Sequence, residues 1–127
     1  ARVLAGGTMS AETGVVIVGD PAHLRRGQSV VGTNITVEEL SGANDVAVET
    51  GTVSLLPQAL DGAADYPYGE SRPEGGRYML DCFETLLSLY KEKRIDSICF
   101  APLNKHSLKI GGMGTADEGD WLTEKLA

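Results

Sequence analysis

The sequence has no apolar run that approaches the roughly 20 residues of a membrane-spanning helix, and no segment has the pattern of a signal peptide. It also has no excess of positive charge, since 11 lysines and arginines stand against 18 aspartates and glutamates. The resulting formal charge of -7 argues against a general nucleic-acid or anionic-membrane binder. We therefore expect a globular protein whose partners are neither nucleic acids nor membranes.

Cysteine is scarce as well. The two cysteines, Cys82 and Cys99, fall in a predicted helix and a predicted strand, and a single pair provides no disulfide framework. We expect two buried, reduced thiols, which is typical of a cytoplasmic protein. The 127 residues suffice for one domain with a hydrophobic core but not for two. The first residue is Ala1 in place of Met, which predicts a processed or shortened product.

The first half of the chain contains one clear strand pattern. Residues 15–18 are apolar and β-branched, and Pro21 ends the run because proline cannot continue a central ladder. Pro21 is also expected to begin a helical turn over residues 22–26. Further on, short strands are predicted around residues 46–48 and 52–55. The glycine- and proline-rich segment 61–76 is typical of a turn-rich connection.

The second half contains the most regular pattern, a helix predicted over residues 77–94. Its apolar residues recur at three- and four-residue steps, which places one stripe, including Phe83 and Leu87, against a core. A short apolar strand is predicted directly after it, over residues 95–100. A helix followed promptly by a buried strand is half of a βαβ unit. We therefore expect an α/β fold, a parallel or mixed sheet flanked by helices, with the helix packed on the sheet.

Three polar residues follow the predicted strand: Asn104, Lys105 and His106. In open α/β sheets the carboxyl ends of the strands are where ligands bind. The Lys105 ammonium can offer three donors to a phosphate or carboxylate oxygen, while the alternative is a solvated surface lysine. A short helix closed by glycines 111 and 112 is expected next, followed by a final helix over residues 117–127.

The segment YGESRPEGGRYMLDCFETLLSLYKEKRIDSICFAPLNKHSLKIGG, residues 68–112, resembles the central part of the 4-hydroxythreonine-4-phosphate dehydrogenase family of pyridoxal phosphate biosynthesis. That family shows a glycine, a Gly-Arg pair seven positions later, a long helix, a strand and a Pro-x-x-Lys loop. The segment VVIVGDPAHLRRG, residues 15–27, also resembles the family's early strand and its Gly-Asp-Pro turn. The residues of this chain that match the family's main motifs are Gly69, Gly76, Arg77, Pro102 and Lys105.

The resemblance implies a fragment of an isocitrate/isopropylmalate dehydrogenase-like fold, with residues 1–127 as the substrate-side part of a two-domain enzyme. The family's opening Gly-Asp-Pro-Ala-Gly-Ile-Gly-Pro-Glu motif and its C-terminal coenzyme-binding part are not in this chain. The implied reaction is the NAD-dependent, metal-assisted oxidation and decarboxylation of a phosphorylated hydroxy acid, such as 4-phosphohydroxythreonine or a related threonate. The resemblance also implies a cytoplasmic homodimer, and it implies that the isolated chain is inactive.

The resemblance assigns roles to three residues. Asn104 and Lys105 stand at substrate-binding positions, and Asn104 replaces a histidine that is usual there, so it would orient substrate without moving a proton. The family's Gly-His-Thr-Glu motif, whose His binds a divalent metal (Zn, Mg, Mn or Co), corresponds to residues 117–120. Glu118 thus occupies the position of the metal-binding His, where a carboxylate favours harder ions. The alternative interpretation is that Glu118 and Asp120 simply stabilise a helix N-terminus.

A second hypothesis from a different class is a non-catalytic ligand-binding or assembly module with the same fold. A parent protein with the opening motif and a downstream His-bearing domain would favour the enzyme. A parent that stops near Ala127 would favour the module.

Overall fold

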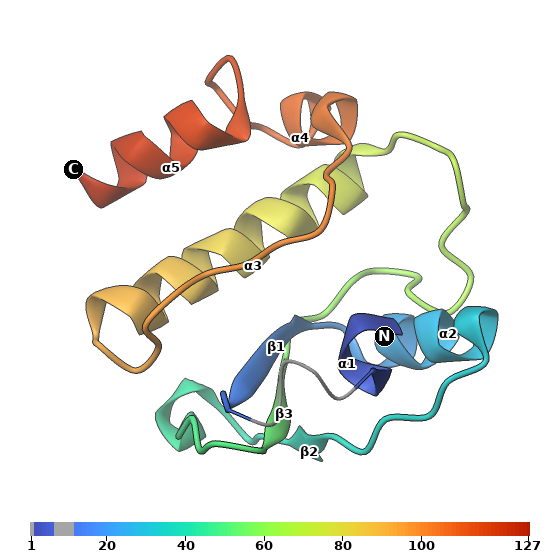
Figure 1. Cartoon of the computed structure of the whole chain (residues 1–127). Helices are drawn as coiled ribbons and strands as arrows, with labels where there is room; N and C mark the ends of the chain where they lie inside the picture. The colour runs from blue at the N-terminus through green and yellow to red at the C-terminus, as the bar shows by residue number, and fades with distance from the viewer. Residues whose placement is uncertain (1, 7–11) are drawn as a thin grey trace. The chain divides into compact units, whose positions relative to one another are not determined.

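The computed structural model describes residues 2–6 and 12–127. They fall into two compact units, Ala1–Asp65 and Tyr66–Ala127. The first unit contains a sheet and the second is helical (Figure 1). In the described part of the chain no helix is long and apolar enough to cross a membrane.

The sheet of the first unit has three parallel strands in the order β1-β3-β2. The central strand, β3, has three successive buried residues, Ser54, Leu55 and Leu56, as is usual for parallel strands covered on both faces. The predicted α/β fold with a parallel sheet is therefore confirmed. The elements of this unit are α1 (Arg2–Ala5), β1 (Val15–Gly19), α2 (Pro21–Val31), β2 (Glu38–Glu39), the 3-10 helix η1 (Ala43–Asp45) and β3 (Val53–Pro57).

The Gly-Asp-Pro turn between β1 and α2 is held by one carboxylate. Oδ1 of Asp20 accepts hydrogen bonds from the N–H groups of Ala22 and His23, at 2.8 and 3.1 Å, and so caps α2. Oδ2 accepts a third bond, at 3.0 Å, from the N–H of Leu60, just beyond β3. Burial raises the pKa of Asp20, but these three donors outweigh burial and hold the pKa below its usual value. The turn therefore links the ends of β1 and β3.

Replacing this carboxylate should destabilise the first unit. For Asp20→Ala we expect a loss of about 2 kcal/mol of unfolding free energy, from a lost helix cap and a lost hydrogen bond. Because the folded-state pKa is lowered, the contribution is present above the unfolded pKa of about 3.9 and is lost as pH falls through the lower folded value. Urea denaturation of the protein that carries this chain measures the loss of unfolding free energy at pH 7 and its decrease at pH 3. The exposed Asp45, changed to alanine, is the control; equal effects at the two positions would contradict the assignment.

Two predictions for the first unit need correction, and one of its strands was not predicted. The helix after Pro21 extends to Val31, well beyond residue 26, because it has both the Asp20 cap and a stop at Gly32, whose φ of 64° suits glycine. Residues 46–48 form no strand; a 3-10 turn precedes them, and Val46 is buried without a ladder. The β2 strand was not predicted, because its two exposed glutamates give no apolar signal.

The second unit contains α3 (Pro73–Lys91), α4 (Lys105–Ile110) and α5 (Glu118–Leu126). All three predicted helices of this half are confirmed, with shifted ends. The long helix begins at Pro73, the favoured first position for proline, and so includes the end of the segment predicted as turns. It stops short of residue 94, because Lys93 adopts a left-handed φ of 59° that breaks the helical backbone.

The core of the second unit lies between these helices. The predicted stripe of α3 is right in its central residues, since Phe83 and Leu87 are buried. The Phe83 ring lies 6.1 Å from the Trp121 ring of α5 and 5.0 Å from that of Phe100. Phe83 and Leu87 were predicted to pack on a sheet, but their described contacts are with helices and a loop. The buried members of their cluster are Phe83, Leu87, Leu108, Met113 and Trp121, which come from helices and a loop.

The strand predicted over residues 95–100 is wrong. The segment is irregular, Ile98 packs against the helical core, and Phe100 is 45% exposed. A short apolar run has the same pattern in a strand and in an extended loop, and only a neighbouring ladder makes it a strand. Among the described residues of this unit no strand is present to provide that ladder.

The two cysteines differ in their surroundings. Both are free, as predicted, but Cys99 is exposed because its segment is not a buried strand. Cys82 lies on α3, and burial raises the pKa of its thiol to about 11. It is therefore an uncharged thiol at neutral pH.

Candidate functional site

The candidate site is built on a close contact between α3 and α4. A Cβ on Gly76 would overlap the backbone of Ser107, and a Cβ on Gly111 would lie 2.5 Å from the N atom of Arg77. Only glycine at both positions allows the two backbones to meet in this way. The contact holds α4 against the first turns of α3, and the predicted substrate loop leads directly into α4.

Asn104 caps α4. Its Oδ1 accepts a hydrogen bond from the N–H of Ser107 at 3.0 Å, which satisfies one of the free donors of the first turn. Its Nδ2 donates to Oγ of Ser71, also at 3.0 Å, and this bond ties the loop before α3 to the loop before α4. The amide has two N–H donors, so one is left for another partner. Ser71 was not predicted from the sequence, because a contact between two loops produces no periodic pattern of residues.

Lys105 is the first residue of α4, and its side chain is 61% exposed. Its Nζ lies 3.8 Å from Oε2 of Glu118, the first residue of α5. The structure thus brings together two of the residues that the sequence singled out. An ion pair so exposed contributes at most about 1 kcal/mol to stability. Its main effect is on the electrostatic potential at the Lys105 ammonium.

The carboxylate of Asp117 lies next to this pair. It caps α5 by accepting a 2.9 Å bond from the N–H of Asp120. That bond, with the N–H of Gly119 and the charge of Lys105, holds the pKa of Asp117 below its usual value, although burial acts in the opposite direction. Glu118 and Asp120, the residues named in the helix-stabilising interpretation, lie in the first turn of α5, but the cap itself is Asp117, which that interpretation did not name. The Lys105 side chain thus has two acidic neighbours, Glu118 and Asp117.

The described residues around Glu118 do not form a metal centre by themselves. Its Oε2 is buried, has no hydrogen-bond donor and has a lysine ammonium as its nearest cation. Within residues 2–6 and 12–127 no three His, Cys, Asp or Glu side chains are grouped as a metal centre requires. Metal ligation by Glu118 stays a prediction, and no catalytic step below is built on it.

The structure also shows the surroundings of the two histidines and of the glycine-rich segment 111–114. His106 is exposed on α4, beside Lys105. His23 belongs to the first unit, where its N–H bonds to Asp20. The glycine-rich segment 111–114 follows a helix, so it lacks the preceding strand of a dinucleotide fingerprint.

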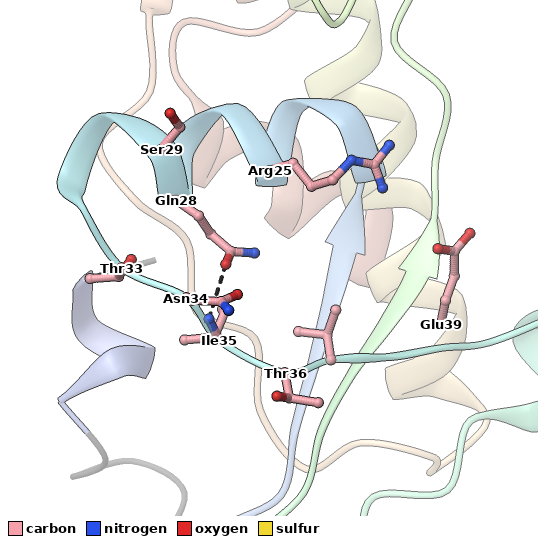
Figure 2. Close-up of a pocket in the computed structure, with 9 residues that line it drawn as sticks. Arg25, Gln28, Ser29, Thr33, Asn34, Ile35, Thr36 and Glu39 are labelled. Atoms are coloured by element: carbon pink, nitrogen blue, oxygen red, sulfur yellow. Dashed lines mark hydrogen bonds between the residues drawn. The ribbon is translucent and has the colours of Figure 1, made fainter.

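An open hollow of about 550 Å³ lies elsewhere, beside α2 in the first unit. Figure 2 shows Gln28 reaching from α2 to the segment that follows, where its Oε1 accepts a 2.9 Å bond from the N–H of Ile35. The hollow is large enough for a small ligand. Its polar groups come from α2, the segment that follows it and Glu39 of β2, and part of them already bond to each other. We therefore place the candidate site at Lys105 and not at this hollow.

Comparison with known proteins agrees with the sequence motifs. The profile of the family described as "Pyridoxal phosphate biosynthetic protein PdxA" matches residues 11–127. A Pseudomonas aeruginosa relative with the provisional name 4-hydroxythreonine-4-phosphate dehydrogenase 2 is 32% identical over 99% of this chain and 37% of its own length. The D-threonate 4-phosphate dehydrogenase of Cupriavidus necator is 26% identical over 87% of this chain and 33% of its own length.

A solved structure shows the same fold. The crystal structure of 4-hydroxythreonine-4-phosphate dehydrogenase from Klebsiella pneumoniae matches with a TM-score of 0.74 and 22% identity, over 86% of this chain and 34% of that one. The chain therefore spans about a third of the length of the proteins it matches. The predicted family resemblance is confirmed, and the chain belongs to the pyridoxal phosphate biosynthetic protein PdxA family.

Proposed function

We propose that this chain is the substrate-side part of a dehydrogenase that oxidises, and then decarboxylates, a phosphorylated hydroxy acid such as 4-phosphohydroxythreonine or a related threonate. The family match over residues 11–127 carries the proposal. The names of the relatives support it, since they include dehydrogenases of 4-hydroxythreonine 4-phosphate and of D-threonate 4-phosphate. The proposed substrates share a hydroxyl group and negatively charged ends.

Lys105 would hold a negatively charged oxygen of the substrate. Its side chain is 61% exposed, so the ammonium can reach a ligand, while its backbone is held by the cap of α4. Asn104 would orient the substrate with the amide N–H that Ser71 leaves free. The Asn104 amide orients the substrate without moving a proton. The two side chains bind and position the substrate for oxidation.

NAD would accept the hydride from the substrate, since hydride transfer is the chemistry that a nicotinamide coenzyme supplies when bound. None of the described residues is assigned to coenzyme binding. For the enzyme as a whole we propose the isocitrate/isopropylmalate dehydrogenase-like architecture, a homodimer and a cytoplasmic location. All three follow from the family resemblance.

The test is an assay of the full protein that carries this chain. A panel of phosphorylated hydroxy acids is supplied with NAD or NADP and with each of several divalent metals. We expect reduced coenzyme, measured by its absorbance, to form with at least one phosphorylated hydroxy acid and not with its unphosphorylated counterpart.

The competing function is a non-catalytic ligand-binding or assembly module. It predicts no coenzyme reduction with any member of the panel, together with measurable binding of a phosphorylated acid by calorimetry. That combination of results would favour the module over the enzyme.

A further inference from the structure

The Glu118 carboxylate lies next to Lys105, the residue proposed to hold an anion. Its Oε2 lies 3.8 Å from the Lys105 ammonium, is buried and receives no hydrogen bond. Although the Glu118 side chain as a whole is 24% exposed, this oxygen is shielded from water, so its charge is screened less than that of a fully exposed carboxylate. Lys105 is thus partly neutralised before any ligand arrives.

The other charged groups of the site increase this effect. Asp117 is ionised at neutral pH, and Lys105 is among the charges that keep it so. Asp120 adds an exposed carboxylate in the first turn of α5. The cation that the described contacts place beside Glu118 and Asp117 is Lys105. The Arg72 guanidinium instead pairs with Glu70, at 2.7 Å. The described electrostatic contacts of Lys105 are therefore with two carboxylates, those of Glu118 and Asp117.

From this geometry we propose that Glu118 is a specificity-determining residue, which limits the ligand group held by Lys105 to a single negative charge. Lys105 would then hold the carboxylate end of the substrate and not its doubly charged phosphate. The inference rests on the proposed function, in which Lys105 contacts an anion. It also gives Glu118 a role that uses its ion pair with Lys105 and needs no metal.

The electrostatic argument gives a quantitative expectation. Coulomb energy is proportional to the charge of the ligand, so the repulsion from Glu118 is twice as large for a dianion as for a monoanion. Removing the charge with Glu118→Gln should therefore raise the affinity for the dianion by the square of the factor gained by the monoanion. If formate gains about threefold, phosphate dianion should gain about tenfold.

The experiment measures the binding of formate and of inorganic phosphate to the full protein at pH 8 and constant ionic strength, by calorimetry or by competition with substrate. Glu118→Gln is compared with wild type and with Glu124→Gln, which removes the same charge from an exposed position of α5. We expect the ratio of phosphate to formate affinity to rise about threefold in Glu118→Gln and to stay at the wild-type value in Glu124→Gln.

Two outcomes would overturn the inference. One is an unchanged affinity ratio in Glu118→Gln; the other is loss of bound divalent metal from that variant, measured by elemental analysis, which would make Glu118 a metal ligand. Lys105→Met separates this failure from failure of the proposed function. If Lys105→Met binds both anions as wild type does, then Lys105 is not the anion site and the substrate contact proposed above is wrong.

Discussion

Lys105→Met should lower kcat/KM of the full enzyme roughly 10- to 150-fold, because deleting a charge-assisted contact costs about 1.5 to 3 kcal/mol. Methionine keeps the apolar stem of the side chain and removes only the ammonium. The change should leave folding almost intact, since the side chain is 61% exposed and its ion pair with Glu118 spans 3.8 Å. Steady-state kinetics and a urea melt of the same preparation measure the two effects.

The variants around Lys105 sharpen this prediction. Lys105→Arg should recover only part of the activity, because a planar guanidinium does not replace a compact ammonium. His106→Ala is the matched control, an exposed neighbour on the same helix that is expected to change kcat/KM little. Full activity in Lys105→Met, or a damaging effect confined to His106→Ala, would show that the loop assignment is wrong.

Gly76→Ala should destabilise the second unit by about 2 to 3 kcal/mol, the upper range for adding a methyl group to a packed interior. The new Cβ would overlap the carbonyl group of Ser107 and would lie 3.1 Å from Cα of Gly111. These are backbone atoms, so they cannot move aside without displacing α4. Alanine has a higher helix propensity than glycine, which by itself would stabilise α3. The expected loss of unfolding free energy is the net value after this gain. Urea denaturation measures the change.

A second glycine provides the control for this prediction. Gly27 lies within α2, and a Cβ there would meet nothing within 4 Å. Gly27→Ala should therefore stabilise the protein by about 0.5 to 1 kcal/mol, because alanine loses less conformational freedom on folding. If Gly76→Ala were as stabilising as Gly27→Ala, α3 and α4 would not be in backbone contact. Because Asn104 and Lys105 stand at the start of α4, Gly76→Ala should also reduce substrate affinity.

Local features of the fold were predictable from the sequence. The β-branched run before Pro21 forms β1, and the apolar stripe containing Phe83 and Leu87 forms the buried face of α3. Both patterns act over a few neighbouring residues, where periodicity and proline chemistry are decisive. The same holds for α4, which Gly111 ends, and for the helix that contains Trp121. The family motifs also lie in continuous stretches of sequence, so the family could be identified without coordinates.

The tertiary structure alone decided which residues meet. Residues 95–100 have the composition of a strand, but a strand requires a hydrogen-bonded neighbour that no local pattern specifies, and the segment is a loop. The sequence likewise singled out Lys105 and Glu118 separately, for a substrate and for a metal. Their ion pair depends on the start of α5 lying beside the start of α4. Charges interact through space, so the electrostatics of the site follow from that packing and not from the order of residues along the chain.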